Sequence, residues 1–98
     1  MFRHVVMMKL KETSTEDDRT AIVEALRALP PLVPEIKSYS VGKDLDVQDG
    51  SFDLVVVADF DNRAGFDAYN ENQDHLDVIA SAIKPHMAQR SAVQYTWE

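Results

Sequence analysis

The sequence predicts an α+β protein of the ferredoxin-like class, with a four-stranded antiparallel sheet and helices on one face. Four segments are rich in strand-forming residues: 2–11, 35–45, 51–61 and 91–98. Two intervening segments, 14–29 and 61–87, carry apolar residues at helical spacing. The resulting order is strand, helix, strand, strand, helix, strand. Since no stretch looks like a linker or a repeat, we expect one domain over residues 1–98.

The composition argues against several function classes. A formal net charge of −7 at pH 7 disfavours nucleic acids and anionic membranes as partners, because such binding depends on lysine and arginine displacing counterions. The chain has no cysteine, which excludes disulfides, cysteine-ligated zinc and a thiol nucleophile. The first apolar stretch is short and is interrupted by Arg3 and His4, unlike a signal peptide or a spanning helix. We therefore expect a cytoplasmic protein.

The first predicted strand, Phe2 to Lys11, alternates between two faces. One face carries Phe2, His4, Val6, Met8 and Leu10, and the other carries Arg3, Val5, Met7, Lys9 and Lys11. Because both faces hold apolar residues near the middle, we expect this strand to be covered on both sides.

The segment 14–29 predicts a helix with Ser14 or Thr15 as its N-cap and acidic residues in its first turn. Its inward stripe is Ile22, Leu26 and Leu29. The prolines that follow at positions 30, 31 and 34 should end the helix and force an extended connection.

Three further strands follow from the pattern. Residues 35–45 form a strand ending near Gly42, and Leu54–Val57 are apolar at consecutive positions, which is typical of a strand buried on both faces. In the last strand, 91–98, one face carries Val93, Tyr95 and Trp97. This stripe is expected to serve core or dimer packing rather than cofactor stacking.

The second helical segment is predicted to be broken. Asp61 or Asn62 caps a first piece through Tyr69, and a second piece runs from about Asp74 to Met87. The residues expected to point inward in the second piece are Leu76, Ile79, Ala80 and Ile83. In an unbroken helix Tyr69 and His75 would lie roughly 240° apart. The polar run between them can break the helix and turn both side chains toward one pocket, where His4 also points.

The open face of the predicted sheet would expose Val5, Met7 and part of the Leu54–Val57 run. An apolar surface of this kind usually marks a partner surface. We therefore predict a homodimer that packs sheet against sheet.

The chain resembles the stress-responsive A/B barrel (Dabb) family. The resemblance covers nearly the whole chain and rests on four segments: HVVMMKLK (4–11), IKSYSVGKDL (36–45), FDLVVVADFD (52–61) and YNENQDHLDV (69–78). It implies a homodimeric α+β barrel with a ligand cavity between each sheet and its own helices.

The resemblance also implies candidate catalytic residues. In a plant polyketide cyclase of this family, a Tyr and a His spaced as Tyr69 and His75 form the catalytic pair, and a first-strand His corresponds to His4. That enzyme works without a metal or an organic cofactor, so we expect neither here. The match has limits, because Asn72-Gln73 replaces a common His-Pro pair, and Leu26 and Leu54 replace two polar pocket residues.

The residue chemistry supports the same assignment. A neutral imidazole can remove a proton from an activated carbon, and a phenol can donate a hydrogen bond to the developing enolate. A structural alternative is that His75 only braces a broken helix while His4 is a satisfied core residue. A metal site formed by His4, His75 and His86 is a further alternative, but the sequence lacks a diagnostic ligand spacing.

From the sequence we therefore predict a Dabb-type protein that binds a small, largely apolar ligand between sheet and helices. Cofactor-independent acid/base catalysis, as in a polyketide cyclase, is the reaction class to test. The alternatives are a non-enzymatic, stress-associated dimeric structural protein and a cofactor-free monooxygenase on the same barrel architecture.

Overall fold

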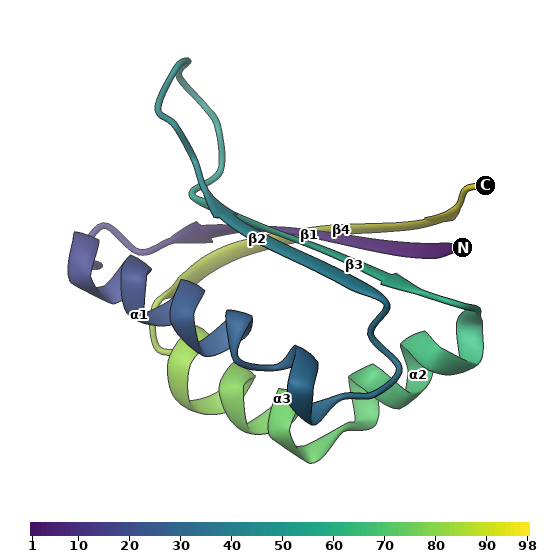
Figure 1. Ribbon diagram of the computed structural model, residues 1–98. Helices are drawn as coiled ribbons and strands as arrows, with labels where there is room; N and C mark the ends of the chain where they lie inside the picture. Colours follow the sequence, from purple (N-terminus) through teal and green to yellow (C-terminus); the bar gives the residue numbers. More distant parts are fainter.

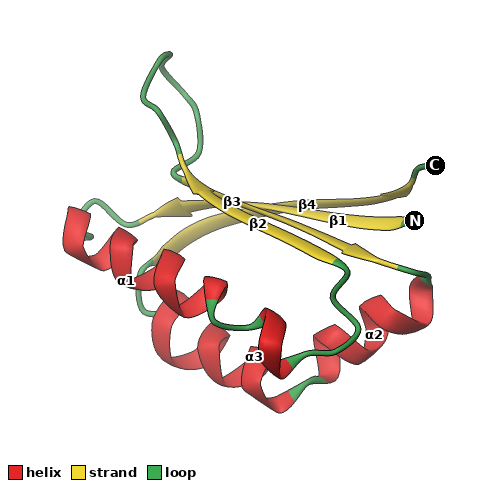
Figure 2. Ribbon diagram, viewed as in Figure 1, coloured by secondary structure: helices red, strands yellow, loops and turns green.

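The computed structural model describes residues 1–98 and consists of one sheet with helices packed against one face (Figures 1 and 2). The strands are β1 (Phe2–Leu10), β2 (Ser38–Lys43), β3 (Leu54–Phe60) and β4 (Met87–Thr96). The helices are α1 (Glu16–Arg27), α2 (Arg63–Glu71) and α3 (Gln73–Val78), with a 3₁₀ turn at Pro30–Leu32 and a π-helical turn at Ile79–Ile83. None of the helices is both long and apolar enough to cross a membrane.

The sheet has the strand order β2-β3-β1-β4, and every neighbouring pair is antiparallel. Strand β3 therefore lies between β1 and β2, which run parallel to each other and are connected through α1. This split βαβ arrangement, repeated with α2, α3 and β4, is the predicted ferredoxin-like fold.

The core lies between the sheet and the helices. On this face β1 and β3 pair His4 with Ala58, Val6 with Val56, and Met8 with Leu54. Val6, Met8, Leu54 and Val56 belong to the main buried cluster. Its other members include side chains from α1, the residues just after it, β2 and the π-helical turn: Ile22, Val23, Leu26, Leu29, Val41 and Ile83. The alternation predicted for β1 therefore places His4 on the same face as the core.

The opposite face of the sheet is uncovered within the single chain. Here Val5 lies between Val57 of β3 and Val93 of β4, and the side chains of Met7 and Val93 are 42% and 55% exposed. Within one chain only one face of β1 is covered, because all the helices pack against that face (Figure 1). The second cover predicted for β1 would have to come from a partner.

Helix α1 begins at a capping box. The Thr15 hydroxyl accepts a hydrogen bond from the Asp18 backbone N–H at 3.1 Å, and the Asp18 carboxylate accepts one from the Thr15 N–H at 2.8 Å. This reciprocal pair satisfies two backbone donors at the helix start. Thr15, not Ser14, is therefore the N-cap.

Several local predictions need correction. Pro30 and Pro31 occupy the start of a 3₁₀ turn instead of an extended connection, since the fixed φ of proline suits the first turn of a helix. Strand β4 begins at Met87, where the sequence predicted helix up to that residue and strand only from 91. Leu76 is 42% exposed and Ala80 is also exposed, although both were predicted inward. Leu76 comes directly after His75 and Ala80 directly after Ile79. Because both of these preceding side chains face inward, Leu76 and Ala80 point about 100° away from the inward face.

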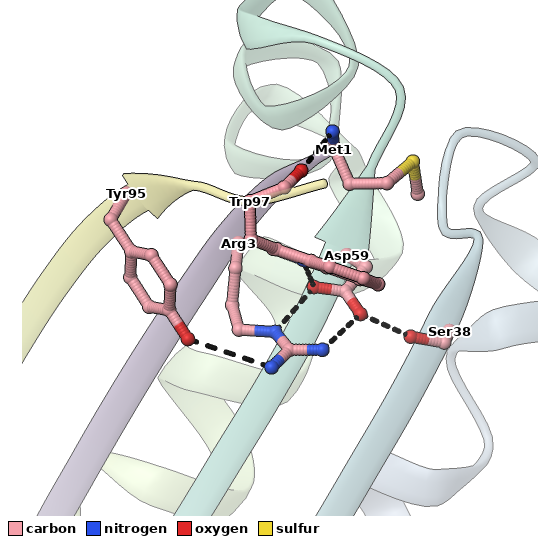
Figure 3. A network of polar contacts seen from close by, with 6 residues as sticks. All are labelled: Met1, Arg3, Ser38, Asp59, Tyr95 and Trp97. Atoms are coloured by element: carbon pink, nitrogen blue, oxygen red, sulfur yellow. Dashed lines mark hydrogen bonds and ion pairs between the residues drawn. The ribbon is translucent and has the colours of Figure 1, made fainter.

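A network of hydrogen-bonded polar side chains lies at one end of the open face (Figure 3). The Arg3 guanidinium donates two hydrogen bonds to the Asp59 carboxylate, at 2.7 and 2.9 Å. The Ser38 hydroxyl and the Trp97 indole N–H donate to the same carboxylate, and these bonds, led by that of Arg3, hold the pKa of Asp59 well below its usual range. The open face thus combines a satisfied polar end with an apolar middle.

Candidate functional site

The site depends on a break between α2 and α3. Asn72 has extended backbone angles, φ −63° and ψ 130°, between the last residue of α2 and the first of α3. Its side-chain oxygen accepts hydrogen bonds from the backbone N–H groups of Asp74, at 2.9 Å, and His75, at 3.3 Å. An asparagine in this position satisfies donors that the new helix would leave unpaired. The break therefore restarts the helix in a new orientation.

This break brings Tyr69 and His75 together. Their ring centroids are 3.9 Å apart and their planes are inclined by 30°, so the two rings are in close, tilted contact. His4 completes the group from β1, with its ring centroid 6.3 Å from that of Tyr69. All three side chains are buried, with 3–7% of their surface exposed.

The three residues line a cavity of about 210 Å³ between the sheet and the helices. Its apolar wall comes from β1, α1, β3, the π-helical turn and the first residue of β4: Val6, Met8, Leu26, Val56, Ile79, Ile83 and Met87. The remaining lining residues are Asn70 and Arg90. The cavity is smaller than the roughly 300–1,000 Å³ of a typical drug-sized site, so it suits a small, largely apolar molecule.

Tyr69 is held as a neutral phenol. Its hydroxyl lies 2.9 Å from that of Tyr39 on β2, and the two share a hydrogen bond. Burial raises the pKa of both phenols, and the neighbouring Tyr39 raises that of Tyr69 further. Tyr69 can therefore donate a hydrogen bond to a bound molecule, but it does not act as a phenolate base.

The imidazole of His75 lies near the backbone carbonyl groups of Tyr69 and Asn70. Its Nδ1 is buried and makes no well-aligned hydrogen bond. Burial lowers the pKa of His75, and the nearby carbonyl groups of Tyr69 and Asn70 oppose part of this effect by favouring the protonated form. At neutral pH the ring is therefore uncharged and retains a basic nitrogen.

His4 has one occupied nitrogen. The Gln94 side-chain amide donates to His4 Nδ1 at 2.8 Å, which leaves the proton of the neutral ring on Nε2. Burial, together with the positive charge of Arg90 and the neighbouring His75, lowers the pKa of His4 to about 4. His4 can therefore act as a neutral hydrogen-bond donor.

The third histidine lies elsewhere. The His86 ring is 3.4 Å from the Ser14 hydroxyl and 3.9 Å from the Asp18 carboxylate, next to α1. No group of three or more His, Cys, Asp or Glu side chains is placed to hold a metal ion. The metal alternative built on His4, His75 and His86 is therefore wrong, because the fold does not bring these residues together.

Sequence reasoning missed three polar residues of the site: Tyr39, Gln94 and Arg90. Tyr39 alternates with Val41 along β2, and both face the helices, so the strand pattern could have suggested its direction. The register that sets Gln94 opposite His4 and Arg90 opposite Met8 depends on the pairing of β4 with β1. No pattern within either strand gives that pairing.

The family of this chain follows from its similarity to known proteins. The family described as Stress responsive A/B Barrel Domain (Dabb) matches residues 2–97. The chain belongs to the Dabb family. No curated protein sequence matches it.

Solved structures of other proteins share the Dabb fold. A dimeric ferredoxin-like protein of unknown function from Thermobifida fusca YX is 38% identical, with a TM-score of 0.90 and coverage of 98% of this chain and 90% of that one. Hydroxynitrile lyase from Passiflora edulis is 20% identical, with a TM-score of 0.82 and coverage of 96% and 90%. An antibiotic biosynthesis monooxygenase is 16% identical, with a TM-score of 0.74 and coverage of 100% and 99%. The last two similarities establish only the shared fold.

The burial of His4 makes stability depend on pH. The pKa of His4 is about 4 in the folded chain, against an ordinary value of 6.5, so between these values the unfolded chain binds more protons. Folding stability should fall as the pH drops from about 6.5 toward 4, by at most about 3 kcal/mol from this residue. His4→Gln should flatten the curve over this interval, as measured by urea unfolding at several pH values. Parallel curves for the variant and the wild type would contradict this assignment.

Proposed function

We propose that this Dabb protein binds a small, largely apolar carbonyl compound in the cavity and removes a proton from the carbon next to the carbonyl. The observation that carries the proposal is the convergence of a neutral imidazole and two hydrogen-bond donors on one apolar cavity. In addition, the buried Nδ1 of His75 lacks a partner within the protein, whereas buried polar atoms normally have one.

His75 is the proposed base. A neutral imidazole nitrogen accepts the proton, and the electron pair of the C–H bond becomes the carbon–carbon double bond of an enolate. Because burial lowers the pKa of His75 below 6.5, the base stays uncharged at neutral pH and into mildly acidic solution. Apolar walls screen charge less than water does, which strengthens polar interactions with the ligand.

Tyr69 and His4 are the proposed donors to the enolate oxygen. The Tyr69 hydroxyl can donate to the ligand while it accepts from Tyr39, whose hydroxyl is 2.9 Å away. The His4 Nε2–H is free because Gln94 occupies the other nitrogen. Donors fixed in place before the reaction stabilise developing negative charge more effectively than mobile water does. The chemistry needs no cofactor, and an enolate formed in this way is the nucleophile of a cyclase-type aldol step.

A purely structural role is the main alternative. It would require His75 to be bonded within the protein and the space around it to be filled. The unpartnered Nδ1 and the cavity of about 210 Å³ favour the ligand-binding proposal instead.

We also propose that the protein is a homodimer joined through the open sheet faces. The T. fusca relative, which is 38% identical, is described as dimeric. The open face of this chain carries the apolar group Val5, Met7, Val55, Val57 and Val93. The loop between β2 and β3 rises on the same side of the sheet (Figure 1), and its Leu45 and Val47 are 84% and 80% exposed. Covering these side chains would remove a large apolar surface from water.

The catalytic proposal is tested with phenylacetone, a small carbon acid with an aromatic body. In D₂O the wild-type protein should accelerate exchange of the benzylic hydrogens for deuterium above the buffer rate, followed by proton NMR. His75→Gln should lower the protein-catalysed rate roughly 100-fold or more, since a positioned base contributes on that order.

Two variants serve as controls for this exchange. His86→Gln replaces a histidine outside the cavity and should exchange at the wild-type rate. Tyr69→Phe keeps the ring and removes only the donor, so a smaller loss is expected. Exchange at the wild-type rate in His75→Gln, or no acceleration by the wild type, would refute the base assignment.

The assembly proposal is tested by placing a charge in the middle of the open face. Val5→Asp and Val57→Asp should each yield monomer or aggregate, because a buried, unpaired carboxylate is strongly unfavourable. Leu32→Asp, at an exposed apolar residue outside the sheet, should remain dimeric. Size-exclusion chromatography with light scattering measures the outcome. Stable dimers of both valine variants would rule out packing through this face.

A further inference from the structure

Arg90 occupies a distinctive place in the fold. It lies on β4 opposite Met8 of β1, on the face of the sheet that the helices cover. Its side chain lines the cavity that His4 and His75 also line, while the residue itself remains exposed. Arg90 therefore lies where the cavity opens to solvent, in contact with both the cavity and the solvent.

Arg90 is the only arginine without a partner. The other four pair with carboxylates or with a backbone carbonyl: Arg3 with Asp59, Arg19 with Asp53, Arg27 with the Val41 oxygen, and Arg63 with Asp67. Arg90 makes no ion pair or hydrogen bond, although the chain has 17 acidic residues against 10 basic ones. Carboxylates are thus abundant in the chain, but none of them pairs with Arg90.

The cavity itself has no negative charge to balance Arg90. Its other lining residues are seven apolar side chains, Tyr69, Asn70 and two histidines, with no Asp or Glu among them. Burial is the main reason that the pKa values of both histidines are lowered, and Arg90 lowers them further. The histidines therefore remain neutral, and the guanidinium is the only full charge on the cavity wall.

His75, which lines the same cavity, is itself only 7% exposed. An unpartnered cation on the wall of an apolar cavity indicates a missing ligand. The Arg90 guanidinium makes the electrostatic potential in the cavity positive, and apolar walls screen this potential less than water would. A ligand that pairs with Arg90 should therefore carry a negative charge.

We propose that the cavity selects a small monoanionic ligand, in which a carboxylate pairs with Arg90 and an apolar body packs against the cavity wall. This inference rests on the proposed function and specifies its substrate class. A guanidinium binds a carboxylate through two parallel hydrogen bonds, a geometry that lysine cannot reproduce. Arg90 is then a specificity-determining residue, distinct from the base and the donors.

The test compares two ligands of matched shape, phenylacetate and phenylacetamide, which differ in charge. Dissociation constants are measured by NMR titration at low ionic strength and neutral pH. The wild type should bind phenylacetate at least about tenfold more tightly than phenylacetamide. Arg90→Gln should remove most of this preference by weakening phenylacetate alone, and Arg90→Lys should restore part of it.

Lys84→Gln provides the matched control. It removes the same unit of charge from a nearby exposed residue that does not line the cavity, and it should keep the wild-type preference. Equal binding of the two ligands by the wild type, or a preference that survives in Arg90→Gln, would overturn the anion proposal while leaving the ligand cavity intact. An equal loss in Lys84→Gln would overturn it too, because net charge would then be the cause. Binding of neither ligand at millimolar concentration would overturn both this inference and the proposed function.

Discussion

The site depends on a single interruption in a helix. In a continuous helix Tyr69 and His75 would face different directions, about 240° apart. One extended residue, Asn72, separates α2 from α3, and its amide oxygen caps the new helix start. The cap compensates for the backbone bonds lost at the break. As a result the two rings are in tilted contact with centroids 3.9 Å apart, at the wall of a cavity rather than on different faces of a helix.

Burial then determines what these cavity residues can do. Burial is the first cause of the shifted pKa values of His4, Tyr69 and His75, and in each case it favours the neutral form. The cavity therefore contains a neutral nitrogen base and neutral donors at the same pH, which is the combination that enolate formation requires. Arg90 adds the one full charge, at the side of the cavity that reaches solvent.

The fold and part of the site can be predicted from the sequence, because both depend on local patterns. Alternation along β1 placed His4 on the core face. His75 lies four and eight residues before the inward-facing Ile79 and Ile83, so the helical period turns its imidazole inward as well. The polar run before His75 indicated the break, although α2 continues past Tyr69 to Glu71. These features follow from the periods of strands and helices, which neighbouring residues determine.

The parts that sequence reasoning missed depend on contacts between distant segments. Gln94 and Arg90 reach the site only through the register of β4 on β1, and Tyr39 reaches Tyr69 across 30 residues. The π-helical turn at Ile79–Ile83, closed by a hydrogen bond from the Lys84 N–H to the Ile79 oxygen at 2.9 Å, lies just before Pro85. There helix periodicity alone misplaced both the helix end and the start of β4.

The central claim is that the cavity between the sheet and the helices receives a ligand. The most direct measurement is an NMR titration of protein labelled at its isoleucine methyl groups, with phenylacetone as the ligand. The chain has four isoleucines, of which Ile79 and Ile83 line the cavity while Ile36 packs in a separate cluster. The account predicts saturable shifts of Ile79 and Ile83, with Ile36 unchanged. No shift of either cavity methyl, or shifts confined to Ile36, would contradict it.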